Sequence, residues 1–135
     1  MAWIETTEAG NVAEEQGLQT RVMTAAEDIK KGNCCTFATG EIADIDAAEL
    51  GPFCIALEDI DDTEEGVVAI APSVIYCLPG AAGFSLGEYL MPSEQTDEQG
   101  RLVVVSTPVF NEVVGVALET IADGATAGKV RLGYF

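Results

Sequence analysis

Short apolar runs alternate with turn residues along most of this chain. From residue 19 onward, runs rich in Val, Ile, Leu and aromatic side chains are separated by Gly, Pro, Asp and Asn. Short runs bounded by such residues indicate β-strands, whereas a helix needs apolar positions spaced three and four apart over a longer stretch. The pattern predicts almost no helix and ten short strands, at 20–24, 34–38, 42–45, 53–57, 67–71, 74–78, 89–91, 102–105, 113–118 and 130–135.

The first 18 residues lack this pattern. They place several glutamates among Ala, Thr and Gly and show no sustained apolar period, which predicts an N-terminal arm at 1–18 followed by a single β domain at 19–135. A chain of 135 residues fits one domain. Trp3 and Ile4 are the apolar pair of this arm, and tryptophan is enriched at interface hot spots. We therefore predict that the arm docks on a partner; the alternative is that Trp3 folds back on its own core.

An internal repeat is the most informative feature of the sequence. Segment 52–60 matches segment 113–121 with the same Ala, Leu, Glu and Ile, and matched blocks upstream and downstream keep the same order, with an offset that drifts from 55 to 62. The repeat predicts two similar β units, at about 24–78 and 79–135, packed into one small barrel or sandwich. The predicted core of the repeated strand consists of Ile55, Leu57, Val116 and Leu118.

Composition and charge narrow the possible partners. Hydrophobic residues make up 48% of the chain and charged residues 21%, as in a packed globule. With 23 acidic and 6 scattered basic residues, the net charge of −17 excludes nucleic acid as a partner. No apolar stretch approaches the ~20 residues of a membrane span, and the start does not resemble a signal peptide. The acidity indicates either attraction to a basic partner or a solvated surface, including one adapted to ~1 M salt, where the screening length falls to about 3 Å.

Side chains that could carry chemistry give no enzyme signature. The chain has no histidine, no phosphate-binding glycine motif and no nucleophile elbow, so we predict that it is not an enzyme and needs no cofactor. Cys34, Cys35, Cys54 and Cys77 lack the spacing of zinc ligands and lie in apolar runs, which favours buried thiols over a disulfide or a metal site. The acidic run 58–65 offers oxygen ligands without the spacing of an EF-hand loop, so a solvated turn is preferred to a calcium site.

The blocks described above resemble a known family. Segment 24–32, the paired segments 55–58 and 115–119, and the ending at 128–132 are similar to the capsid cement, or head decoration, proteins of tailed viruses over residues 19–135. This resemblance implies a compact β domain that forms a homotrimer on the outer surface of an HK97-type icosahedral capsid. It further implies a protein made in the host cytoplasm that stabilises the virion by bridging subunits of the major capsid protein, often with an N-terminal arm. The family has no catalytic residues. The acidity of this chain departs from the family pattern and fits a virus of a salt-loving host, such as a haloarchaeon.

Two other classes remain as alternatives. Segment 26–32 also resembles the entry to SAF-type β modules, which predicts a ligand-binding module with a polar pocket and monomeric behaviour. A calcium-binding surface domain would instead show a melting temperature that rises with calcium.

Overall fold

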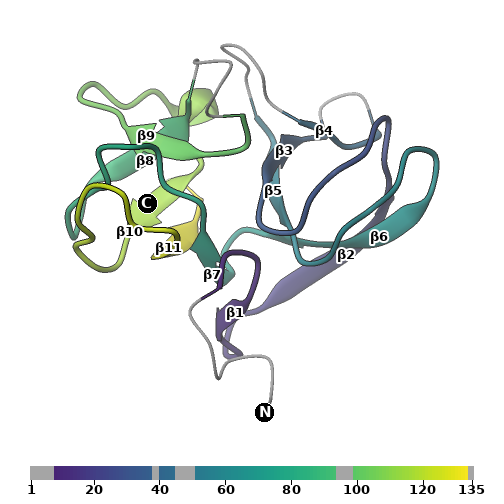
Figure 1. The fold of residues 1–135 in the computed structure, drawn as a ribbon, viewed down its shortest axis with the longest axis horizontal. Coiled ribbons are helices and arrows are strands. Elements are labelled where there is room, and N and C mark those ends of the chain that lie inside the picture. The colour runs from purple at the N-terminus through teal and green to yellow at the C-terminus, as the bar shows by residue number, and fades with distance from the viewer. Residues whose placement is uncertain (1–7, 38–39, 45–50, 94–98, 134–135) are drawn as a thin grey trace.

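The structure, a computed structural model, describes residues 8–37, 40–44, 51–93 and 99–133. Regular structure in these residues is almost entirely β-strand, arranged in two antiparallel sheets that are barrel- or sandwich-like without closing (Figure 1). The all-β prediction is confirmed. The elements are β1 (Val12–Glu14), β2 (Gln19–Thr24), β3 (Cys34–Thr36), β4 (Ala43–Asp44), β5 (Phe53–Ala56), β6 (Glu65–Ile70), β7 (Val74–Cys77), β8 (Tyr89–Pro92), β9 (Leu102–Val104), the 3-10 helix η3 (Phe110–Glu112), β10 (Gly115–Ala117) and β11 (Gly128–Leu132).

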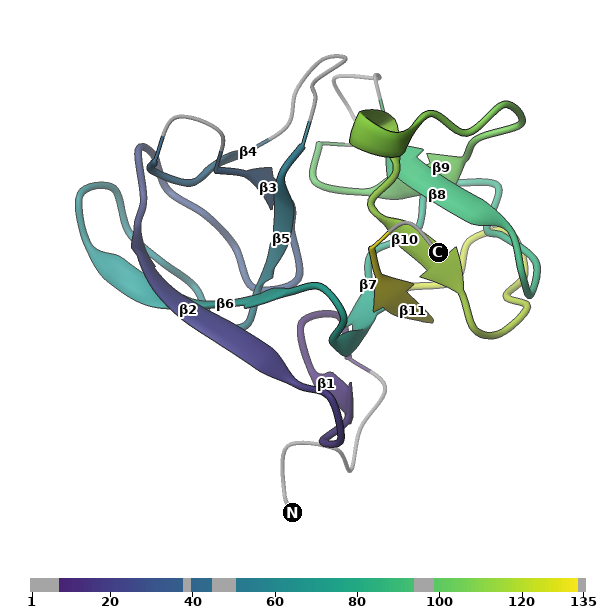
Figure 2. The same ribbon diagram turned by 180° about the vertical axis from the view of Figure 1, so that it is seen from behind.

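The two sheets have the same strand order. The first sheet runs β2-β6-β5-β3-β4, and the second runs β1-β7-β11-β10-β8-β9. Apart from β1, each strand of the second sheet holds the place of the strand five numbers lower in the first. In Figures 1 and 2 the two sheets form separate lobes that meet where β6 leads into β7.

Equivalent main-chain hydrogen bonds fix the corresponding turns of both units. The N–H of Gly32 donates to Ala56 O, and that of Gly87 donates to Ala117 O, at 2.8 Å in each case. The carboxylates of Glu58 and Glu119 each accept a bond from a main-chain N–H of the closing strand, from Val67 N at 2.8 Å and from Lys129 N at 2.7 Å. These bonds show that the two units are similar in structure. The internal repeat in the sequence stays a prediction.

The border between the units differs from the predicted one. Strand β7 lies at the end of the predicted first unit, 24–78, yet it pairs with β11 in the second sheet. The turn at 71–73 therefore divides the sheets. Strands β6 and β7 are two apolar runs separated by a short turn, and such runs do not reveal which strands they will pair with.

Part of the expected arm belongs to the sheet. Val12 of β1 is 3% exposed and stands opposite Ile75 of β7. The N–H of Gly10 donates to Tyr76 O at 2.7 Å, and the N–H of Tyr76 donates to Asn11 O at 3.0 Å. The described residues 8–18 thus form an integral part of the fold, and only 1–7 of the predicted arm lie outside the described residues. Strand β1 has three residues and one buried apolar side chain, which is too short for the alternation of apolar and polar residues that predicts a strand.

The buried side chains form two clusters. The main core joins both sheets and consists of Val12, Cys34, Ile55, Ala69, Ile75, Cys77, Phe84, Leu90, Leu102, Val114, Ala117, Val130 and Leu132. The second core lies within the first unit and consists of Ala25, Ile29, Cys35, Ile42, Cys54, Ala56, Ile60 and Val68. Successive residues of β3, β5 and β6 face the two cores alternately, since side chains alternate across a strand.

Ser73 fastens the junction between the sheets. Its fully buried hydroxyl accepts a bond from Gln19 N at 2.7 Å and donates to Gln19 O at 3.0 Å. Its main-chain oxygen accepts from Leu132 N at 2.9 Å, and its N–H donates to Ile70 O at 3.0 Å. One residue therefore connects β2 and β6 of the first sheet to β11 of the second.

Replacing Ser73 with alanine is expected to lower the free energy of unfolding by about 1–3 kcal/mol, because both main-chain groups of Gln19 lose their hydroxyl partner. Chemical denaturation of the variant measures this change. The matched control is Ser85→Ala, at an exposed position, which should leave stability within about 0.5 kcal/mol of the original. Equal effects of the two substitutions would contradict the role of Ser73.

Candidate functional site

The predicted docking pair, Trp3 and Ile4, lies outside the described residues. The described chain begins at Glu8, whose Oε2 lies 3.1 Å from Lys31 Nζ in an exposed ion pair. Glu8 therefore lies beside the turn of the first unit that contains Lys31. Docking by Trp3 and Ile4 stays a prediction.

The predicted repeat core is only partly buried. Ile55 is fully buried in the main core, whereas Leu57 packs against that core from a half-buried position. Val116 and Leu118 are also half-buried. The two leucines still hold equivalent places, since the N–H of each donates to the closing strand of its own unit, Leu57 to Val67 O and Leu118 to Lys129 O.

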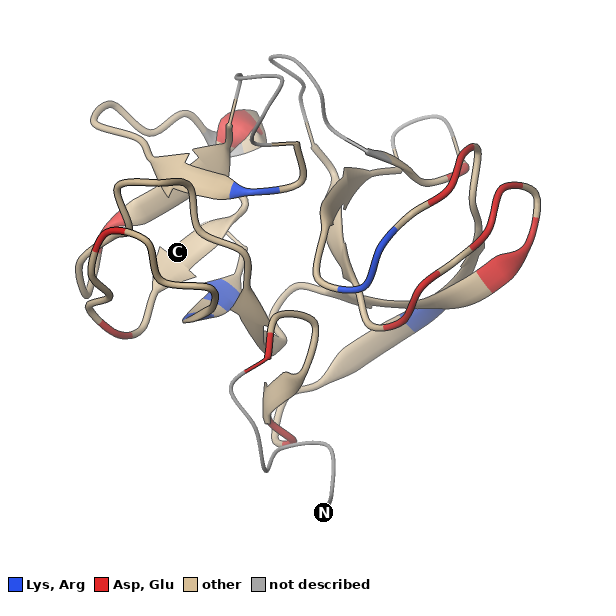
Figure 3. Ribbon diagram, in the orientation of Figure 1, with Lys and Arg blue, Asp and Glu red and all other residues tan. Residues whose placement is uncertain are grey.

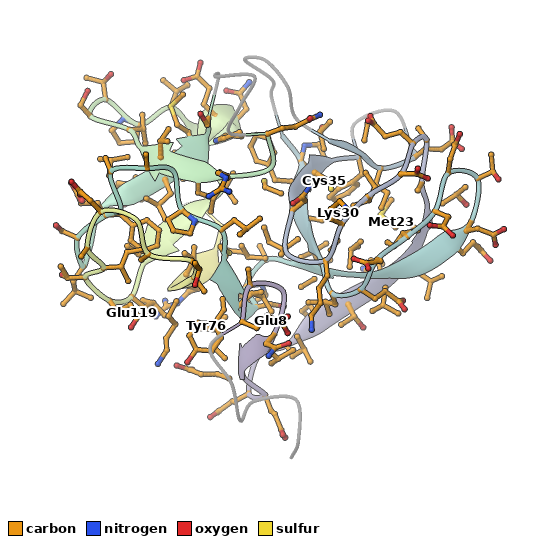
Figure 4. The ribbon with its side chains drawn as sticks, in the orientation of Figure 1. Glu8, Met23, Lys30, Cys35, Tyr76 and Glu119 are labelled. Carbon is orange, nitrogen blue, oxygen red and sulfur yellow. The ribbon has the colours of Figure 1, made fainter. Side chains whose placement is uncertain are left out.

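All four cysteines are buried free thiols. Cys35 and Cys54 stand opposite each other on β3 and β5 and face the second core (Figure 4 labels Cys35). Cys34 and Cys77 face the main core, and burial raises the pKa of the Cys77 thiol far above its ordinary value. A thiol held neutral in an apolar core is a packing element and a poor nucleophile.

Aspartate carboxylates join the acidic run 58–65 to the neighbouring segment 28–31. Asp59 Oδ1 accepts a bond from Lys31 N at 2.8 Å, and Asp28 Oδ1 accepts one from Asp62 N at 2.9 Å. These aspartates border a polar hollow of about 380 Å³ that also includes Lys30. Among the described residues, no three His, Cys, Asp or Glu side chains are grouped so that they could hold a metal ion. Across the same residues, no helix is long and apolar enough to cross a membrane.

An apolar pocket of about 410 Å³ lies between the two units. Its wall comes from Phe37, Gly51, Pro52, Phe53, Ile70 and Ala71 of the first unit and from Asn111, Val113 and Val114 of the second. The N–H of Gly51 donates to Asn111 O at 2.8 Å and ties the two sides together. The lining contains no charged side chain, so the pocket could receive an apolar group but offers no charge to orient a polar substrate.

Exposed apolar side chains gather on two sheet edges. Four large hydrophobic side chains are exposed among the described residues. Three of them are Val22 on edge strand β2, at 65%, Val104 on edge strand β9, at 38%, and Val109 in the segment between β9 and η3, at 51%. Segments 16–26 and 102–111, which contain these residues, have no acidic residue. In Figure 3 the acidic residues of both units lie mostly on loops, while β9 is uncharged and β2 carries only Arg21.

Sequence reasoning did not single out these edges. The signal was present, because an acid-free stretch in so acidic a chain is expected to be buried or in contact with a partner. The predicted border between the arm and the β domain, at residues 18 and 19, falls within segment 16–26. A strand pattern alone also does not show whether the strand lies at the edge of a sheet.

The fold is shared with a viral structural protein. The crystal structure of the head fiber gp8.5 N base of bacteriophage phi29 superimposes with a TM-score of 0.59 at 16% sequence identity, covering 87% of this chain and 98% of that chain. At this identity the likeness concerns the fold. No protein-family model matches the chain, and no curated protein matches it.

Proposed function

We propose that this chain is a non-catalytic structural protein of a tailed-virus virion. It decorates the outer surface of an icosahedral capsid as a homotrimer and stabilises the capsid by bridging subunits of the major capsid protein. The observation that carries the proposal is the fold shared with the phi29 head fiber base over nearly the whole of both chains. The blocks that resemble cement proteins support the same class independently.

The physical properties of the described domain suit such a role. A mostly β body with a core common to both sheets is rigid, and its pocket between the units lacks the charged groups expected of a catalytic centre. A bridging protein needs several modest contacts rather than one strong contact, because tethering at several points slows dissociation far more than any single contact does. A homotrimer supplies three equivalent contacts.

Trp3 and Ile4 provide the proposed capsid contact. An extended segment can add a strand to an exposed sheet edge and place apolar side chains in pockets. Since the net charge of −17 opposes contact with an acidic shell, this contact is apolar and main-chain in character. The same acidity suits a virus that infects a haloarchaeon, where molar salt screens the repulsion between the protein and its shell.

The test measures binding to empty shells of the virus that encodes the chain. Deleting residues 1–7, or replacing Trp3 and Ile4 together with alanine, is expected to weaken co-sedimentation with the shells at least tenfold, since aromatic anchors carry much of an interface energy. Thr6→Ala with Thr7→Ala is the matched control in the same segment and should bind like the original. The assay is run in dilute buffer and in molar KCl.

Two outcomes would count against these proposals. Undiminished binding by the Trp3 and Ile4 variant removes the docking role of the segment and leaves the decoration role standing. Failure of the original chain to bind shells at both salt concentrations removes the decoration role itself. A melting temperature that rises with calcium would then favour the calcium-binding class instead.

A further inference from the structure

Strand β2 presents main-chain hydrogen-bonding groups at an edge of the first sheet that is covered only at its end, where Thr24 O accepts from Ile42 N at 3.0 Å. Its neighbour among the described strands is β6. The N–H of Ala25 donates to Glu64 O at 2.9 Å, and alternate residues of an antiparallel strand point their polar groups to opposite sides. Applied to the β2–β6 register, this rule directs the N–H and C=O groups of Thr20 and Val22 away from β6. Thr20 O accepts a bond from Arg21 Nη1 at 3.2 Å, so the open groups are the N–H of Thr20 and both groups of Val22.

The corresponding edge of the second sheet is covered. Tyr76 of β7 is equivalent to Val22 of β2. Tyr76 stands opposite Lys129, and Val22 stands opposite Val67. The N–H of each of these opposed residues donates to a glutamate carboxylate. The two residues that precede β1 satisfy Tyr76, which donates to Asn11 O and accepts from Gly10 N. The described chain supplies no equivalent of β1 for Val22, so the second sheet shows how the edge of the first could be completed.

The outer edge of β9 is covered only in part, because Leu102 N donates to Leu78 O and Leu102 O accepts from Gly80 N, each at 2.8 Å. The N–H of Val105 donates to Tyr89 O at 3.0 Å, and the β8–β9 register then directs the N–H and C=O of Val104 away from β8. The side chains of Val104 and Val109 are exposed on the same segment. Figures 1 and 2 both place β9 and β2 on opposite sides of the molecule.

Charge makes these two edges the favourable places for contact between copies. Two chains that each carry a net charge of −17 repel wherever their acidic loops approach. The edges of β2 and β9 combine exposed valines and unpaired main-chain groups with acid-free segments, at 16–26 and 102–111. Open main-chain groups on an edge strand without protecting acidic residues favour contact with another chain.

We propose that copies of this chain associate head to tail, with the β2 edge of one copy, at Thr20 and Val22, against the β9 edge of the next, at Val104 and Val109. Contacts between two different surfaces on opposite sides of a molecule either close into a ring or continue as a filament. The number of copies in the ring rests on the homotrimer of the proposed function; the choice of surfaces does not.

The test introduces an acidic side chain at each edge. Val22→Glu and Val104→Glu are each expected to reduce the mass measured by light scattering from that of the ring to that of one chain, and to raise the apparent dissociation constant at least tenfold, because the contact would then bury an unpaired carboxylate. Leu86→Glu is the matched control, since Leu86 is as exposed as Val22, at 65%, but lies outside both edges. Melting temperatures of all three variants check that the domain remains folded.

Mixing the two edge variants tests the head-to-tail arrangement directly. The Val22→Glu chain keeps an intact β9 edge and the Val104→Glu chain keeps an intact β2 edge, so an equal mixture is expected to form dimers that cannot close. A self-pairing β2 edge would instead leave the Val104→Glu ring intact, which overturns the proposal.

A monomeric original chain, or disruption of the ring by Leu86→Glu to the same extent, also overturns it. These outcomes are distinguishable from failure of the proposed function. A monomer that binds shells rejects the ring and the homotrimer but keeps the decoration role, whereas a ring that binds no shell rejects only the decoration role.

Discussion

Replacing Ile55 with alanine is expected to lower the free energy of unfolding by about 2–5 kcal/mol, the range observed when a large aliphatic side chain is truncated in a core that cannot collapse around the cavity. Ile55 is fully buried in the main core, on a strand whose neighbours on both sides are also buried. Denaturant titration followed by far-UV circular dichroism measures the change in the free energy of unfolding.

The second unit provides the control for this substitution. Val116 is predicted to match Ile55 in the repeat but is half-buried, so Val116→Ala should cost about 1 kcal/mol, as expected for partial loss of buried apolar surface. Similar losses at the two positions would mean that burial in the main core does not determine the contribution of Ile55.

Deleting residues 1–14 is expected to destabilise the domain by about 3–5 kcal/mol. The deletion removes the buried side chain of Val12, worth roughly 1.5–3 kcal/mol, and two main-chain bonds to Tyr76, each worth about 1 kcal/mol. It also uncovers the edge of β7, which favours aggregation.

Deletion of residues 1–7 is the comparison for this experiment. That shorter truncation preserves Val12 and both bonds to Tyr76, so its unfolding midpoint should match that of the full chain. If the chain lacking residues 1–14 were as stable as the chain lacking residues 1–7, β1 would contribute nothing to the stability of the domain. The predicted arm would then include β1.

The sequence predicted most strands because their local pattern is strong. All ten predicted segments overlap observed strands, since each combines an apolar run with a nearby turn residue, as at Gly100 before β9. Strand β1 was not predicted because Val12 is the one buried residue among its three. The pairing of β7 with β11 was not predicted either, because pairing depends on tertiary geometry that a run such as 74–78 does not encode.

The candidate site was less predictable than the fold. Leu57 and Leu118 follow the same Ala in the same pattern, which predicts the same environment for both but does not reveal how much of each side chain neighbouring loops cover. The apolar pocket joins residues from distant segments, as the bond from Gly51 to Asn111 illustrates. The two partly open edges follow from strand order, so they become visible only after the sheets are assembled.

The junction at Ser73 has a mechanical consequence. Force applied to the first sheet passes through Ser73 to Ile70 and Gln19 on one side and to Leu132 on the other. The main core spans the same junction, so the lobes cannot swing about the 71–73 turn as a hinge without breaking buried contacts. In the decoration role that we propose, a shell that expands or shrinks would be braced by a stiff domain, and the strain would be taken up at the points of attachment.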